Sequence, residues 1–211
     1  MRLVDDKLKV KLHPSVLVRA LRAALRPGHF ECQRCGSCCS AYTVCVTDSD
    51  AKRIIDLYGI PPHNFLTGVI VPDEVAHTYT GIPRFIGERG RGMVLALKEK
   101  DGRCVFNDGE CEVYPARPLN CRAFPFLWLG GNKFKLNPDA LFICKGIGKG
   151  GKYNFKKVFE EMALLEKEWK HYGVLVEEWN TRVRSGNVVP STRNFIRFLL
   201  EEEEWGTRDS T

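Results

Sequence analysis

Hydrophobic positions recur at helical spacing near both ends of the chain. In residues 1–29, apolar residues three or four positions apart alternate with arginines, which predicts a basic amphipathic helix. The same spacing returns over residues 155–179, and a last helix is expected over 191–205. The glutamates at 201–204 oppose the dipole of that helix, so we expect its end to fray or to face a partner.

The middle of the chain predicts shorter elements. Thr47 and Asp50 have the spacing of a capping box, and Gly59 ends the helix that this box begins. Two alternating runs joined at 101–102 predict a β-hairpin, and a second hairpin is expected to turn at 130–132.

Two other segments are rich in proline or glycine and are predicted to be loops. Residues 109–126 also carry cysteines, and residues 144–152 are expected to wrap the centre that the cysteines form. The predicted fold class is α+β: a small, irregular, cysteine-rich core with short hairpins, flanked by N- and C-terminal helices. It divides into the helix at 1–29, a metal-binding domain at 30–150, and a helical extension at 151–211 packed on the same domain.

The composition indicates that the nine cysteines are not needed to hold the fold together and have a chemical role. A chain of 211 residues with 44% hydrophobic residues can bury a core without disulfides. No apolar stretch has the length of a signal peptide or of a membrane span, so we expect a cytoplasmic protein without membrane contact. Cytoplasmic thiols stay reduced or bind metal.

The net charge of +6 is concentrated at the N-terminus. The first 40 residues hold eight Lys or Arg and three Asp or Glu, which gives +5 of the +6. Such a helix could contact nucleic acid or an acidic protein, but a solvated helix face is the favoured interpretation.

The main chemical signal is a CxxCxxCC run, formed by Cys32, Cys35, Cys38 and Cys39. Ferredoxins use a CxxCxxC run for three corners of an iron–sulfur cluster, whereas structural zinc more often uses two CxxC pairs. The second half of the chain has no CxxC pair; its cysteines are Cys104, Cys111, Cys121 and Cys144. This spacing favours a cluster over a zinc ribbon.

One cysteine is expected to stand apart from the rest. Cys45 lies in an alternating run, which indicates a packed strand residue. Cys38 and Cys39 are adjacent and cannot easily bind the same ion, because consecutive side chains diverge. The eight remaining thiols could form two four-thiolate sites, or one site with a spare set of reactive thiols.

These stretches resemble the CxxCxxCC (YkgJ-like) cysteine-cluster family, described as zinc- or iron-chelating proteins and often called iron–sulfur oxidoreductases. The resemblance rests on FECQRCGSCC, CVFNDGECEVYPARPLNCRAFPF and CKGIGKG, and covers residues 30–150. It implies that the metal ligands are Cys32, Cys35, Cys38, Cys39, Cys104, Cys111, Cys121 and Cys144. A similar cluster in flagellin lysine N-methylase suggests redox or methyl-transfer chemistry somewhere in the wider group.

Three further residues are candidates for cofactor binding: Tyr114, Arg117 and Arg122. An arginine near thiolates offsets their charge and can receive an anionic substrate. The alternative is that these guanidinium groups hold the ligand loop in place.

The leading functional hypothesis is a [4Fe-4S] iron–sulfur protein with an electron-transfer or redox role and an unidentified redox or protein partner. The first alternative is a zinc-binding structural module that contacts RNA or a protein. The second alternative is an accessory part of a methyltransferase-type enzyme.

Overall fold

The computed structural model describes residues 14–26, 28–72, 81–129 and 133–200. The predicted turn at 130–132 and the acidic run at 201–204 lie outside these residues. Helices and small sheets of two or three strands confirm the α+β class. The chain divides into two compact units, each built from two segments: Met1–Val44 with Leu97–Lys167, and Cys45–Ala96 with Glu168–Thr211.

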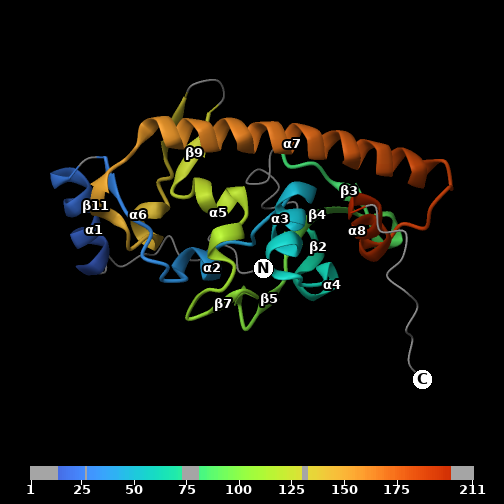
Figure 1. Ribbon diagram of the computed structural model, residues 1–211, viewed down its shortest axis with the longest axis horizontal. Helices are drawn as coiled ribbons and strands as arrows, with labels where there is room; N and C mark the ends of the chain where they lie inside the picture. The colour runs from blue at the N-terminus through green and yellow to red at the C-terminus, as the bar shows by residue number, and fades with distance from the viewer. Residues whose placement is uncertain (1–13, 27, 73–80, 130–132, 201–211) are drawn as a thin grey trace. The chain divides into compact units, whose positions relative to one another are not determined.

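In the first unit, distant segments meet beside the N-terminal helix. Helix α1 (Pro14–Leu25) contacts α6 (Ala140–Ile143) and β11 (Ile147–Lys152), and β11 pairs antiparallel with β1 (His29–Phe30). Figure 1 shows these elements side by side. The prediction of a loop at 144–152 was therefore wrong for most of its length. Residues 147–152 form a strand because they pair with β1, a two-residue strand more than 100 positions away.

Glycine permits this pairing. A Cβ at Gly146 would lie 2.2 Å from the carbonyl oxygen of Glu31, and one at Gly148 would lie 2.8 Å from the Cβ of Arg22. Both distances are too short for a side chain, so the backbones can approach only because these residues are glycines.

Helix α1 is attached through an arginine rather than through its leucines. The guanidinium of Arg19 donates to the carbonyl oxygens of Leu141 (3.0 Å) and Phe142 (2.7 Å). Leu17, Leu21 and Leu25 are all more than half exposed. The expectation that the arginines form a solvated face is wrong for Arg19, whose side chain satisfies carbonyl groups of α6.

Most of the rest of the first unit consists of short elements, some of which carry cysteines. They are α2 (Ser37–Ala41), β5 (Glu99–Lys100), β6 (Arg103–Cys104), β7 (Asn107–Asp108), β8 (Glu110–Cys111), η4 (Tyr114–Ala116), α5 (Leu119–Ala123), β9 (Phe126–Trp128) and β10 (Phe134–Leu136). The β5–β6 and β9–β10 pairs confirm both predicted hairpins. The segment predicted to be loop at 109–126 is wrong in part, since it contains β8, η4 and α5.

In the second unit, one helix begins as predicted. Helix α3 (Asp48–Tyr58) has the capping box: the Asp50 amide donates to Thr47 Oγ1, and the Thr47 amide donates to Asp50 Oδ2, both at 3.1 Å. Gly59 ends the helix with φ 64°. Arg53 then pairs with Asp50 and with Glu168 Oε1 (2.7 Å), so the buried carboxylate of Asp50 at the start of α3 has a cationic partner.

The core of the second unit is aromatic. Helix α4 (Pro62–Phe65) leads into a three-stranded sheet of β2 (Leu66–Ile70), β4 (Gly92–Leu97) and β3 (Phe85–Ile86), with η3 (Glu88–Gly90) between the last two in sequence. Phe195 of α8 (Thr192–Leu200) stacks on Phe85 with ring centroids 4.0 Å apart. Trp179 lies 5.5 Å from Phe195 and donates from Nε1 to the carbonyl of Ile86.

Trp179 belongs to α7 (Phe155–Arg184), a helix of 30 residues that extends the predicted 155–179 by more than a turn.

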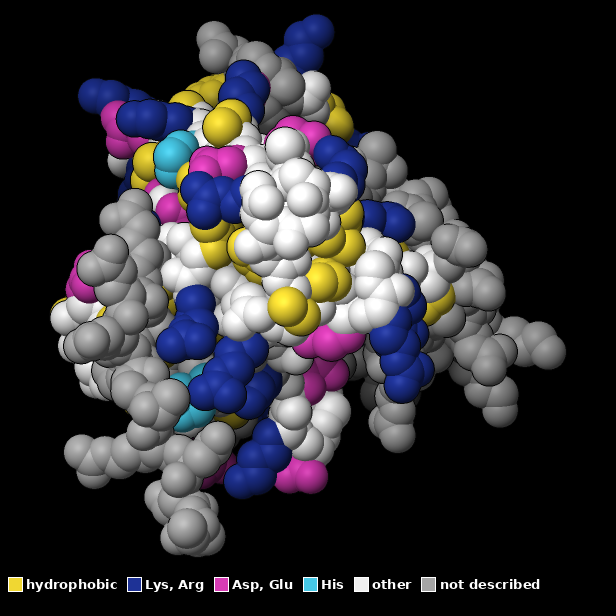
Figure 2. All heavy atoms as spheres, turned by 90° about the vertical axis from the view of Figure 1, so that its right-hand side faces the viewer, with side chains coloured by type: hydrophobic (Ala, Val, Ile, Leu, Met, Phe, Trp, Pro, Cys, Tyr) yellow, Lys and Arg dark blue, Asp and Glu magenta, His cyan; other side chains and the backbone are white. Residues whose placement is uncertain are grey.

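On the face that Figure 2 presents, Lys and Arg side chains occupy several separate places, with hydrophobic side chains visible between them. That face therefore carries a mixed surface rather than a single basic patch.

Candidate metal centre

The CxxCxxCC run lies where an irregular segment becomes helix. Gly36 adopts φ 67° at the start of α2, so Cys38 and Cys39 occupy the first turn of that helix. Side chains one position apart on a helix point in different directions, as expected for these two thiols. A Cβ at Gly36 would lie 2.7 Å from Asn107 Oδ1, which leaves room only for glycine.

The second group of cysteines comes from four short elements of the same unit. Cys104 ends β6, Cys111 ends β8, Cys121 lies within α5, and Cys144 directly follows α6. Helix α2 packs against both β6 and α6. The fold therefore brings the two sequence groups of cysteines together within one compact unit.

Charge effects on thiol pKa values link Cys38 to cysteines of the second group. A hydrogen bond with Cys39, followed by burial, raises the pKa of Cys38 far above its usual range. Burial raises the pKa of Cys104 to about 11, with contributions from Cys111 and Cys38. Burial also raises the pKa of Cys144, again with a contribution from Cys38. Thiols from both sequence groups are thus close enough to repel one another when charged.

At four of these cysteines, the amide two residues further along the chain favours the thiolate form. These amides are Ser37 for Cys35, Phe106 for Cys104, Val113 for Cys111, and Gly146 for Cys144, the last at 3.4 Å. An N–H donor stabilises a charged sulfur and so lowers the pKa of its thiol. The pattern supplies support for thiolates from four separate places in the sequence.

The pKa of Cys35 is lowered overall. Burial acts to raise its pKa, but the hydroxyl of Ser37 (3.3 Å), the amides of Ser37 and Lys145, and the charge of Lys145 together outweigh it. Cys35 is also exposed, so it is the most accessible thiol of the group.

Cys45 lies apart from the other cysteines. It lies in the second unit, forms an isolated β-bridge with Ala96, and packs with Val71 and Val94. Burial alone raises its pKa to about 12. The prediction of a packed strand residue is confirmed.

The three candidate cofactor-binding residues have different contacts. Arg117 donates to Cys32 Sγ (3.7 Å) and stacks on the Tyr114 ring at 4.2 Å, with Arg34 4.1 Å from the same ring centroid. Arg122 instead forms an ion pair with Glu161 at 3.1 Å. Arg117 thus contacts a thiol directly, whereas Arg122 is held by α7.

The chemistry of the donor set fits a thiophilic metal group. No disulfide joins any of the nine cysteines, all of which are described. Asn107 Nδ2 is buried beside Gly36 and has no hydrogen-bond partner within the described ranges, so a donor is left available next to the CxxCxxCC run. Within those ranges, no group of three or more His, Cys, Asp or Glu side chains has an arrangement that could hold a metal ion. The thiols are neighbours whose side chains would have to turn and lose protons on binding a metal.

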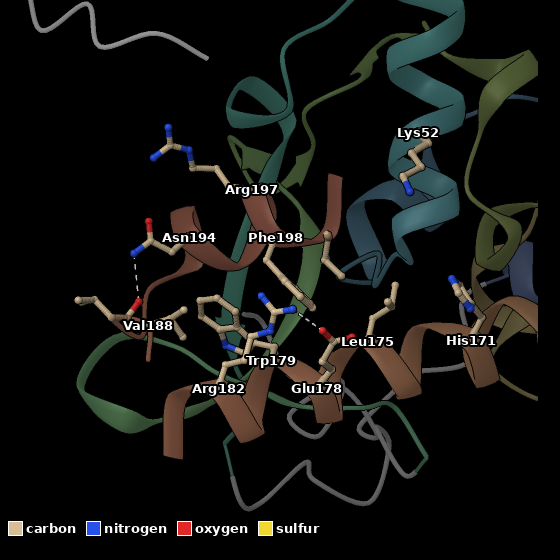
Figure 3. A pocket seen from close by; sticks show the side chains of 12 residues that line it. Lys52, His171, Leu175, Glu178, Trp179, Arg182, Val188, Asn194, Arg197 and Phe198 are labelled. Atoms are coloured by element: carbon tan, nitrogen blue, oxygen red, sulfur yellow. Dashed lines mark hydrogen bonds and ion pairs between the residues drawn. The ribbon is translucent and has the colours of Figure 1, made fainter. Parts of the chain in front are cut away.

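A hollow of about 960 Å³ lies in the second unit, and no cysteine lines it. It lies between α7 and α8, with Lys52 and His171 at one end (Figure 3). Arg182 pairs with Glu178 there and covers the Phe198 ring at 4.9 Å. Despite its size, this hollow has none of the thiols on which the metal chemistry depends.

The fold and the site together define a cysteine-cluster protein of the α+β class. A family model described as "Putative zinc- or iron-chelating domain", with the name CxxCxxCC, matches residues 31–145. These 115 residues are more than half of the chain, which therefore belongs to the CxxCxxCC family.

One relative is the "Uncharacterized protein MJ0661" of Methanocaldococcus jannaschii, 33% identical over 127 residues. The match covers 57% of this chain and 59% of that protein, so it spans less than two thirds of the relative. No solved structure matches the chain. Among the helices that the structure describes, none has both the length and the apolar character needed to cross a membrane.

Sequence reasoning missed several residues beside the thiols. Asn107 lies within the stretch CVFNDGECEVYPARPLNCRAFPF but was not singled out there, and only the fold reveals its position next to Gly36. Lys152, Tyr153 and Lys157 line a hollow that includes Cys32, although they are 120 or more positions away. The pairing of β1 with β11 brings the first two there, and nothing local in the sequence signals it.

Proposed function

We propose that this chain is an iron–sulfur protein that binds a [4Fe-4S] cluster through thiolates of both cysteine groups and serves in electron transfer or redox chemistry. The observation that carries the proposal is the set of four amide donors, each two residues after a cysteine, in four separate segments. Amide hydrogen bonds to sulfur are among the features by which proteins tune iron–sulfur clusters. The CxxCxxC spacing favours such a cluster over a pair of zinc knuckles.

The residues available as ligands are those of the two groups: Cys32, Cys35, Cys38, Cys39, Cys104, Cys111, Cys121 and Cys144. A bound cluster would supply reversible one-electron transfer. The protein's own contribution is to hold the sulfurs with amide donors, to place the Arg117 guanidinium beside Cys32, and to limit solvent at the buried thiols of Cys104 and Cys144. A cation beside a thiolate offsets the accumulated negative charge.

The decisive experiment is anaerobic purification followed by measurement of iron, zinc and acid-labile sulfide per chain. We expect a brown protein with iron and sulfide in similar amounts. A colourless protein with stoichiometric zinc and no sulfide would reject the cluster and support the zinc module instead. Cys35→Ser tests the ligand set within the same experiment and is expected to lose the metal. Cys45→Ala is the matched control, because Cys45 packs in the second unit.

A further inference from the structure

A hollow of about 260 Å³ opens beside Cys32 in the first unit. Its lining includes Cys32, Tyr114, Arg117 and Arg122, and α7 contributes Lys157. Pockets for drug-sized ligands measure about 300–1,000 Å³, so this one is suited to a smaller molecule. The three residues that the sequence marked as cofactor-binding candidates therefore share one cavity with a thiol of the candidate centre.

The wall of the hollow is aromatic. Phe30 and Tyr153 are stacked, with centroids 5.7 Å apart and planes at 27°, and Phe126 meets Tyr153 edge-on at 4.6 Å. All three rings are partly exposed, so they can still contact a ligand. Aromatic walls of this kind favour a flat, apolar body.

The charge of the lining is positive. Four cations line the hollow, namely Arg117, Arg122, Lys152 and Lys157, against two anions, Glu31 and Glu161. Glu161 is already paired with Arg122 at 3.1 Å. These six side chains carry a formal charge of +2 (4 − 2), which becomes +1 when Cys32 is counted as a thiolate of the proposed centre, and a positive lining favours an anionic ligand.

We propose that this hollow is a ligand site for a small planar carboxylate, such as an aromatic or conjugated acid, bound next to Cys32. The flat body lies against Phe30, Tyr153 and Phe126, and the carboxylate is held by the cations at the hollow. The inference rests on the proposed function in one respect, since it names the class of small molecule that the metal centre would meet.

The test is titration of anaerobically purified, metal-loaded protein with benzoate, followed by calorimetry. We expect saturable binding of one benzoate per chain. Benzyl alcohol, which keeps the ring and lacks the charge, should bind about tenfold more weakly. Cyclohexanecarboxylate, which keeps the charge and lacks the flat ring, should bind about threefold more weakly. Absence of saturable benzoate binding, or equal binding of all three compounds, would overturn the proposal.

Two neighbouring lysines on α7 provide a matched pair of variants. Lys157→Gln removes a charge that lines the hollow and should weaken benzoate binding about two- to fivefold. Lys156→Gln removes an equal charge one residue away, where the side chain is 87% exposed and does not line the hollow, and should leave binding unchanged. An equal effect of both changes would mean that benzoate responds only to general charge, and the site would be rejected.

Metal and sulfide are counted on the same samples, which separates this proposal from the previous one. Metal-loaded protein that does not bind benzoate overturns the pocket and leaves the cluster standing. Protein that lacks metal but binds benzoate with the expected preference supports the pocket and contradicts the cluster.

Tyr153→Phe keeps the ring and should bind as the parent does, whereas Tyr153→Leu should lose about threefold in affinity.

Discussion

Removing the metal should loosen two distant parts of the sequence at once. If thiolates of both groups hold one centre, the metal closes the loop between Cys39 and Cys104, which spans 65 positions (104 − 39). By analogy with a cross-link, closing a loop of that length contributes about 4 kcal/mol of folding free energy. This figure is an upper value, because the packing of α2 on β6 and the β1–β11 pairing already close part of the loop.

The assay is amide hydrogen exchange, measured by mass spectrometry on holo protein and on protein freed of metal by chelation or oxidation. Each 1.4 kcal/mol of folding free energy corresponds to a tenfold change in protection against exchange. A loss of about 4 kcal/mol should therefore lower the protection of residues 30–45 and of residues 100–150 by up to about a thousandfold. Helix α3 and helix α8 supply no proposed ligand and serve as internal controls whose exchange should change little. A rise confined to residues 30–45 would show that the two groups of cysteines form separate sites, and the shared centre would be refuted.

Three further predictions concern single residues. Cys45→Ala should keep the parent's metal content while Cys121→Ser loses it, and equal losses by elemental analysis would show that the ligand set is wrong. Phe195→Ala removes a fully buried ring and should lower the free energy of unfolding by about 3–5 kcal/mol in urea titration, whereas Phe155→Ala, at a ring 54% exposed, should cost less than about 1 kcal/mol. In metal-free protein, iodoacetamide should modify Cys35 at a lower pH than Cys45. The reagent reacts with the thiolate, which forms as pH rises through the pKa, and the pKa is lowered at Cys35 and raised to about 12 at Cys45. Peptide mass spectrometry measures the order of modification, and the reverse order would contradict this prediction.

Elements with local signals were predictable from the sequence. The capping box of Thr47 and Asp50, the stop at Gly59 and the hairpin turn at 101–102 are each encoded within a few residues, and all three are present. Helix α7 was predicted but ended too early, because Asn180 to Arg184 break the apolar spacing while still helical. In the structure Asn180 is held by Arg84 and Ile86, which lie far away in the sequence.

Elements with non-local causes were not predictable. Strand β11 reads IGKGGK, and glycine has low strand propensity, so only its partner β1 makes it a strand. Helix α5, by contrast, has a local signal that was missed within a segment that looked irregular, since Pro118 directly precedes it and serves as its N-cap. At the site, the sequence identified the thiols and the arginine near them, but the direct contact of Arg117 with Cys32 depends on the fold.

The interleaved order of the two units has a consequence for how the protein is made. The chain passes from the first unit to the second, back to the first, and again to the second. Cys144 follows Cys39 by 105 positions (144 − 39), and ribosomes add about 5–20 residues per second, so the early thiols emerge roughly 5–20 s before the last one. During that interval the second group of cysteines is still incomplete, because Cys104 follows Cys39 by 65 positions (104 − 39) and Cys144 by 105. Any centre that uses both groups is completed only after most of the chain has been synthesised, and the early thiols must be kept reduced until then.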